Sequence, residues 1–162
     1  MSQTTLDIKE PGLNVLPPGV ERHTVNAGGL TGLQIFPDDE IEIINDEGNQ
    51  ICEVICFNKD GKSELGILNL KENCKESFIK EILKKKSESS FVTNLQLKKR
   101  NLDINKSKSS LLFDNKTPSG ETIKIKSKDK CYVIFSAPQN DMLVSEQNPS
   151  SDLTIFIKRA KI

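Results

Sequence analysis

The stretch "NDEGNQICEVICFN", residues 45–58, places turn-forming residues ahead of an apolar run that carries two cysteines four positions apart. A run of this composition after such a turn predicts a β-strand. In a strand, Cys52 and Cys56 share one face and Glu53 lies on the other. The Cα atoms of the two cysteines are then about 13 Å apart, whereas a disulfide needs them within about 7 Å and one zinc ion needs both sulfurs at about 2.3 Å. We therefore interpret both cysteines as buried core thiols rather than as half of a metal or redox site.

Neighbouring segments extend this β pattern in both directions. The segment "DDEIEIIND" (38–46) alternates isoleucine with glutamate, so it predicts a strand that forms a hairpin with the strand at 50–58. The segment "ETIKIKSKDKCYVIFSAP" (121–138) predicts an edge strand followed by a central strand, and "DLTIFIKRA" (152–160) predicts a last strand with one apolar face. We expect a mainly β (α+β) fold, an antiparallel β-sandwich or barrel of six or seven strands with a helical insertion around residues 72–100.

The insertion carries a different periodicity. The apolar residues of its first half recur at the spacing of an amphipathic helix: Phe78, Ile79, Ile82 and Leu83. Residues 89–101 favour a second short helix over a strand, with Phe91, Val92 and Leu95 facing inward. Asn73 or Ser77 is a candidate cap for the first helix, and the polar residues 101–110 predict a loop.

Composition and charge limit the classes of partner. The 162 residues fit one domain, 1–162, with a proline-rich extended arm at 1–20. Lys plus Arg (23) balances Asp plus Glu (23), and the basic runs lack interleaved aromatic residues, so we expect no nucleic-acid and no membrane partner. No apolar run is long enough to span a bilayer and no leader pattern opens the chain, so we expect a cytoplasmic protein with reduced thiols.

Few residues are candidates for chemistry. Glu53 is the only charge inside its apolar strand, which makes it a weak candidate general base or ligand; a carboxylate that faces solvent, or pairs with a lysine or Arg22, is the simpler explanation. Gln50 and Glu53, with Asn140 in the loop after the central strand, are candidate substrate-binding residues, although turn formation alone explains Gln50 and Asn140. We predict no metal site; the alternative joins Cys74, Cys131 and His23, together with Glu53, around zinc.

A family resemblance rests on two stretches that cover about a third of the chain. The segment "FPDDEIEIINDEGNQICEVICFN" resembles the opening hairpin of the urea carboxylase-associated domain family, whose pattern falls on the following residues: Asp46, Gly48, Gln50, Glu53, Phe57 and Asn58. The segment "VIFSAPQND", followed by "NPSSDLTIFI", is similar to the closing strand, loop and final strand of that family.

The resemblance implies that this domain works together with other, catalytic domains. Members of the family occur in urea and guanidine catabolism and at the N-terminus of folate-dependent aminomethyltransferase-like demethylases. Active members bind zinc largely through cysteines, but Ala137 stands where they carry a cysteine in the Ser-x-Cys-Pro loop, and a Lys-rich helical segment replaces their middle section. The resemblance therefore implies an accessory domain for methylated amines, either substrate-handling or oligomerising, with no cofactor of its own. Tetrahydrofolate is implied for an associated domain, and zinc is possible here.

The partners implied are a folate-binding aminomethyltransferase domain or subunit and further copies of the chain itself. Two alternatives remain at this point. One is a zinc-dependent lyase or hydrolase domain that acts on a small nitrogen compound. The other is a pure protein-interaction domain whose exposed sheet or helical insertion docks a partner.

Overall fold

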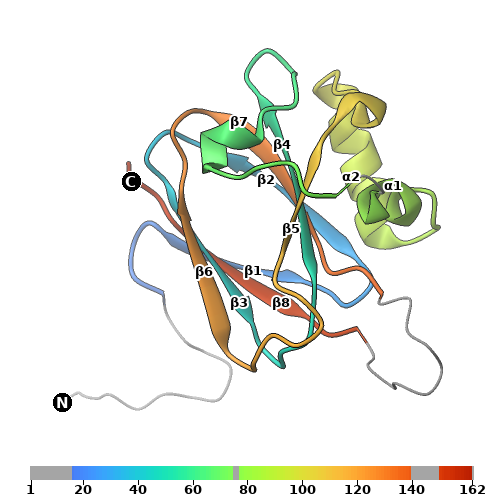
Figure 1. The fold of residues 1–162 in the computed structure, drawn as a ribbon. Helices are drawn as coiled ribbons and strands as arrows, with labels where there is room; N and C mark the ends of the chain where they lie inside the picture. Colours follow the sequence, from blue (N-terminus) through green and yellow to red (C-terminus); the bar gives the residue numbers. More distant parts are fainter. Residues whose placement is uncertain (1–15, 75–76, 140–149, 162) are drawn as a thin grey trace.

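The computed structural model describes residues 16–74, 77–139 and 150–161, and within them it forms two packed β-sheets and a helical insertion (Figure 1). The strands are β1 (Val20–Val25), β2 (Leu30–Ile35), β3 (Glu40–Asn45), β4 (Cys52–Asn58), β5 (Ser109–Leu112), β6 (Glu121–Lys126), β7 (Cys131–Ser136) and β8 (Leu153–Lys158). The helices are α1 (Phe78–Leu83) and α2 (Glu88–Lys99), with short 3-10 turns η1 (Leu65–Leu68) and η2 (Ile104–Lys106).

Each sheet has four strands, and every pairing is antiparallel. The first sheet has the order β1-β8-β3-β6 and the second the order β2-β7-β4-β5. The sheets pack face to face without closing into a barrel, which confirms the predicted mainly β sandwich. β6 is an edge strand and β7 a central one, as predicted.

Strand alternation divides the apolar residues between two clusters. Cys52, Val54 and Cys56 of β4 point between the sheets, into a core that also takes up Leu153, Ile155 and Ile157 of β8. Ile55 and Phe57 point to the opposite side, where they pack against the helical insertion. The burial of both cysteines confirms the prediction, made from the period-two pattern of this strand, that they are core residues.

The predicted hairpin between 38–46 and 50–58 is wrong. β3 and β4 lie in different sheets, so the turn between them carries the chain from one layer to the other. The strands around 121–138 behave in the same way, because β6 joins the first sheet and β7 the second. Periodicity identifies a strand and its buried face, but it does not identify the hydrogen-bonding partner.

The insertion covers the outer face of the second sheet (Figure 1). Ser77, one of the two predicted candidates, caps the α1 helix: its side chain accepts a hydrogen bond from the Lys80 amide. Its Ile79, Ile82 and Leu83 side chains are buried against the sheet.

The second helix is present but faces the other way from the prediction. Phe91, Val92 and Leu95 are exposed, while Ser90, Thr93 and Leu97 are buried. The predicted loop at 101–110 is also partly wrong, because residues 109–112 form the edge strand β5, which β4 and the side chain of Asn73 hold in place.

Two further expectations concern the N-terminal arm and membranes. Residues 1–15 of the predicted extended arm lie outside the described part, and β1 begins at Val20, inside the range given to that arm. Among the described residues, no helix has the length and apolar character needed to cross a bilayer.

Candidate functional site

Glu53 lies fully buried on the face of β4 that meets the helical insertion. Its carboxylate accepts hydrogen bonds from the Ser77 hydroxyl at 2.8 Å, from the Ile79 amide at 2.8 Å and from the Ser109 hydroxyl. The Ile79 amide belongs to the first turn of α1, where helix N–H groups lack intrahelical acceptors and favour a negative charge. Glu53 therefore holds the start of α1 against β4 and β5.

This arrangement differs from both expectations for Glu53. The carboxylate is buried, and among the described residues it forms no ion pair; three uncharged donors bind it inside the protein. A general base needs access to a substrate proton, and here the groups next to the carboxylate belong to the fold. The geometry assigns Glu53 a structural task.

Gln50 is also fully buried and connects distant segments. Its side-chain amide donates to the carbonyl of Pro138 at 2.9 Å, and its side-chain oxygen accepts from the amide of Ser151 at 2.8 Å. Asn45 donates to the Gln50 carbonyl at 2.7 Å. Gln50 thus ties the turn between β3 and β4 to both sides of the segment 139–150, and its polar atoms bind the chain itself. Asn140, the third predicted binding residue, lies outside the described residues.

The four residues of the alternative metal site are not brought together. His23 lies on β1, where its Nε2 atom contacts the Glu21 carboxylate at 3.0 Å, and Cys131 lies on β7 in the core. Cys74 precedes α1 and forms an isolated bridge with Ser109. Across the described ranges, no three His, Cys, Asp or Glu side chains are placed to hold one metal ion. His23, Cys74, Cys131 and Glu53 therefore do not form one ligand set in the described part of the chain.

Cys52 and Cys56 behave as ordinary core thiols, whereas the hydrogen bonds of Cys131 with Cys56 and Ser127 lower the pKa of the Cys131 thiol. Burial raises the pKa of Cys52, and the contact with Cys131 together with burial raises the pKa of Cys56. A thiol whose pKa is raised stays protonated and is a poor nucleophile or metal ligand. Ala137, at the position of the family's cysteine, is fully buried in the same core.

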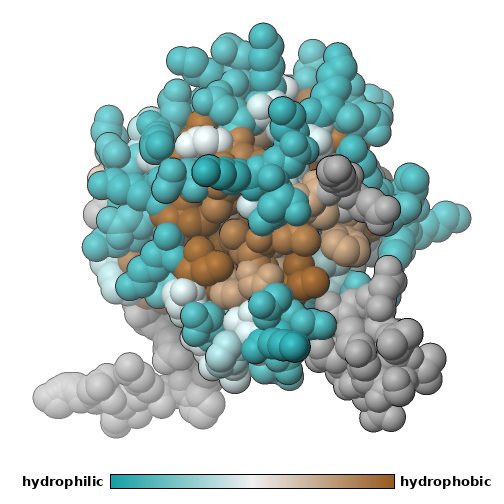
Figure 2. Space-filling view, viewed as in Figure 1, coloured by the Kyte–Doolittle hydropathy of each residue, from teal (hydrophilic) through white to brown (hydrophobic). Residues whose placement is uncertain are grey.

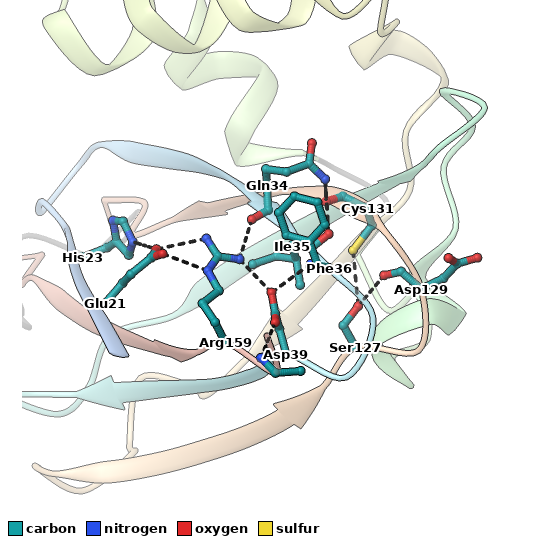
Figure 3. Close-up of polar contacts among 11 residues, drawn as sticks. Glu21, His23, Gln34, Ile35, Phe36, Asp39, Ser127, Asp129, Cys131 and Arg159 are labelled. Atoms are coloured by element: carbon teal, nitrogen blue, oxygen red, sulfur yellow. Dashed lines mark hydrogen bonds and ion pairs between the residues drawn. The ribbon is translucent and has the colours of Figure 1, made fainter. Parts of the chain in front are cut away.

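A polar network that the sequence did not indicate lies where β1, β2 and the end of β8 meet (Figure 3). Arg159 donates two hydrogen bonds to the Glu21 carboxylate, at 2.8 and 3.0 Å, one to Asp39 at 2.7 Å, and one to the Gln34 carbonyl at 2.9 Å. The hydrogen bond from Arg159 lowers the pKa of Glu21. Since Glu21 and Gln34 belong to different sheets, Arg159 joins the two layers, and only the three-dimensional fold brings these residues together.

A polar pocket of about 330 Å³ lies beside the C-terminal end of α2. Arg100 lies over the ring of Tyr132, 4.5 Å from its centroid, and donates to the Gln34 side chain at 2.6 Å. Lys59 and Lys130 add positive charge, and Asp60 adds one negative charge. The ring of Tyr132 lies across Gly32, where a Cβ atom would stand 2.0 Å from the tyrosine oxygen. The pocket offers basic donors, but a specific ligand is not defined by them.

One area of apolar surface lies away from this pocket. Figure 2 shows it in the middle of the face on which Figure 1 places β5 and β6, the two edge strands on the open side of the sandwich. A hollow of about 470 Å³ beside β6 is lined in part by Leu68, Leu70 and Ile123.

The fold and these contacts define a two-sheet antiparallel β-sandwich domain with a helical insertion, whose conspicuous buried polar residues serve the fold. Comparison with known proteins then gives two findings. The chain is 31% identical over 153 residues to a protein named trimethylamine-oxide aldolase from Ruegeria pomeroyi, a match that covers 94% of this chain. The chain spans only 19% of the length of that relative.

The second finding concerns the fold alone. A crystal structure of a DUF1989 family protein from Silicibacter pomeroyi DSS-3 superimposes with a TM-score of 0.52 and 9% sequence identity, covering 88% of this chain and 80% of that one. No family model matches the chain.

Proposed function

We propose that this chain is an accessory domain of the urea carboxylase-associated type, in a system that handles methylated amines together with a folate-binding aminomethyltransferase-like domain or subunit. The observation that carries this proposal is the 31% identity, across nearly the whole chain, to a trimethylamine-oxide aldolase. Because the match covers a small share of that relative, most of the relative lies outside the part that this chain resembles.

The contacts of the candidate residues support an accessory role over a catalytic one. Glu53 and Gln50 fall on the pattern of the resemblance, but their polar atoms are engaged by Ser77, Pro138 and Ser151 inside the fold. Ala137 supplies a methyl group where a thiolate ligand is expected of an active member. These residues preserve the scaffold of a binding domain while their side chains stabilise it.

A chimera tests the proposal directly. In the Ruegeria pomeroyi trimethylamine-oxide aldolase, the segment that matches this chain is replaced by residues 1–162, and the loss of trimethylamine N-oxide is followed by proton NMR. We expect turnover within about tenfold of the parent enzyme, because the proposal places the chemistry in the part of the relative outside the match. A soluble, folded chimera without turnover contradicts the accessory role.

A variant of the chimera separates structure from catalysis. Glu53→Gln keeps the shape of the side chain, so the folded chimera that carries it should keep the same kcat. A loss of kcat with unchanged thermal unfolding would show that the Glu53 carboxylate takes part in the reaction.

Metal analysis of the purified chain is the second test. The accessory proposal expects zinc well below one ion per chain, since the described residues do not assemble a ligand set. One zinc per chain that disappears in Cys131→Ser contradicts the proposal and supports the zinc-dependent lyase or hydrolase alternative.

A further inference from the structure

The outer face of α2 carries an apolar stripe that nothing in the described structure covers. Phe91, Val92 and Leu95 are 69%, 49% and 53% exposed, and they are three of the four large apolar side chains that are exposed among the described residues. Isolated exposed apolar residues are common on protein surfaces, but a cluster on one helix face indicates an interaction site.

The direction of α2 is held by hydrogen bonds on its opposite face. The Ser90 hydroxyl donates to the Ile82 carbonyl at 2.6 Å, and the Asn94 side chain donates to the Leu83 carbonyl at 3.0 Å. Both acceptors lie in the last turn of α1, where carbonyls lack intrahelical partners. Rotating α2 to bury the stripe would break these bonds and expose Leu97, so the stripe remains outward.

Opposite charges stand at the two ends of the stripe. At 100° per residue, Glu88 and Lys99 lie on the same line of the helix surface as Val92 and Leu95, at spacings of four, seven and eleven residues. Both charged residues are exposed. The stripe therefore runs from a negative end, through an apolar middle, to a positive end.

Such a stripe is complementary to itself in one orientation. In an antiparallel pair of α2 helices related by a two-fold axis, Glu88 of each copy faces Lys99 of the other, and Val92 faces Leu95. A parallel pair would place Glu88 against Glu88 and Lys99 against Lys99, which is unfavourable. The charge pattern thus selects both the partner and its direction.

We propose that the α2 stripe binds a second copy of this chain through an antiparallel, two-fold symmetric helix pair. A 12-residue helix is about 18 Å long, so the buried area falls below that of a standard stable interface. The dimer is therefore weak and forms in a concentration-dependent manner. This proposal stands independently of the proposed function.

Sedimentation equilibrium of the full chain across a wide concentration range tests the proposal. We expect a monomer–dimer equilibrium for the natural sequence and a monomer for Phe91→Ser at the same concentrations. Glu88→Lys and Lys99→Glu each turn both ion pairs into repulsive pairs, so each should weaken the dimer about tenfold. Lys116→Glu changes the charge by the same amount in an exposed loop residue away from α2 and should leave the equilibrium unchanged.

A mixture of the two charge variants gives the decisive arm. A heterodimer of Glu88→Lys with Lys99→Glu has two attractive pairs again, so mixing should restore dimer formation, and the double variant Glu88→Lys/Lys99→Glu should dimerise by itself. Circular dichroism confirms that each variant is folded. A natural chain that stays monomeric, a dimer indifferent to Phe91→Ser, or a mixture that stays as weak as its components would overturn the proposal. If the stripe instead binds a different domain, the natural chain stays monomeric in this experiment, which is the first of the overturning results.

Discussion

The α1 and α2 helices cover the same face of one sheet, but the side chains that they bury differ: those of α1 are apolar and those of α2 are mostly polar. α1 buries Ile79, Ile82 and Leu83 against the strands, and Glu53 holds its first turn from below. α2 instead buries two polar residues, Ser90 and Thr93, beside a single apolar one, Leu97, and leaves Phe91, Val92 and Leu95 exposed. The difference shows that apolar residues alone do not set the direction of a helix. Hydrogen bonds from α2 to the end of α1 set it, and the apolar face of α2 is left available to a partner.

The sharpest way to break this comparison is to truncate one apolar residue in each helix. Ile79 is fully buried, so Ile79→Ala removes core contacts and leaves a cavity, with an expected loss of about 2–5 kcal/mol in the free energy of unfolding. Phe91→Ala should change it by less than about 0.5 kcal/mol, because the ring is exposed. Urea unfolding at low protein concentration measures both. Similar losses for the two variants would mean that α2 packs through its apolar stripe.

The anchor of α1 is the second target. Glu53→Ala leaves the Ser77 and Ser109 hydroxyls and the Ile79 amide without their buried acceptor, so we expect a loss of about 3 kcal/mol. Thermal unfolding compared with Glu42→Ala provides the control, because Glu42 lies on the outward face of the other sheet and should contribute less than about 0.5 kcal/mol. Equal effects would remove Glu53 from its structural role.

The attachment of α2 gives a smaller effect. Ser90→Ala removes the hydrogen bond to the Ile82 carbonyl and should reduce the free energy of unfolding by about 1 kcal/mol. The neighbouring Ser89→Ala keeps that bond and should have little effect. If the two variants unfold alike in urea, the bond to α1 is not what orients α2.

Local pattern predicted the strands β3, β4, β6, β7 and β8, but not β1 or β5. The alternation in β4 correctly placed Cys52, Val54 and Cys56 in the core, because a strand that is buried on both sides still separates its side chains by parity. The same reasoning identified β8 and its apolar face, and the capping residue Ser77 marked the start of α1. These features depend on neighbours along the chain.

Features that depend on distant residues could not be predicted. The turn at Gly48 looks like a hairpin turn, but pairing with β6 and β8 takes β3 into the other sheet. The strand β5 was not predicted, because its serines do not form an apolar pattern. Ser109 is buried nevertheless, and its hydroxyl is hydrogen-bonded to Glu53. The sequence made Gln50 and Glu53 candidate site residues, because a polar residue in an apolar strand can belong either to a functional site or to a structural hydrogen-bond network. Only their partners distinguish the two.

The central claim is that α1 belongs to the core of the domain and that α2 presents an interface. A dilution series of ¹⁵N–¹H correlation spectra of the full chain tests it most directly, because each backbone amide reports separately. We predict concentration-dependent shifts that concentrate along α2, around Glu88, Val92, Leu95 and Lys99, while the amides of α1 and β4 stay unchanged. Shifts centred on α1 or on the open edge of the sandwich, or no shifts at all, would contradict the claim.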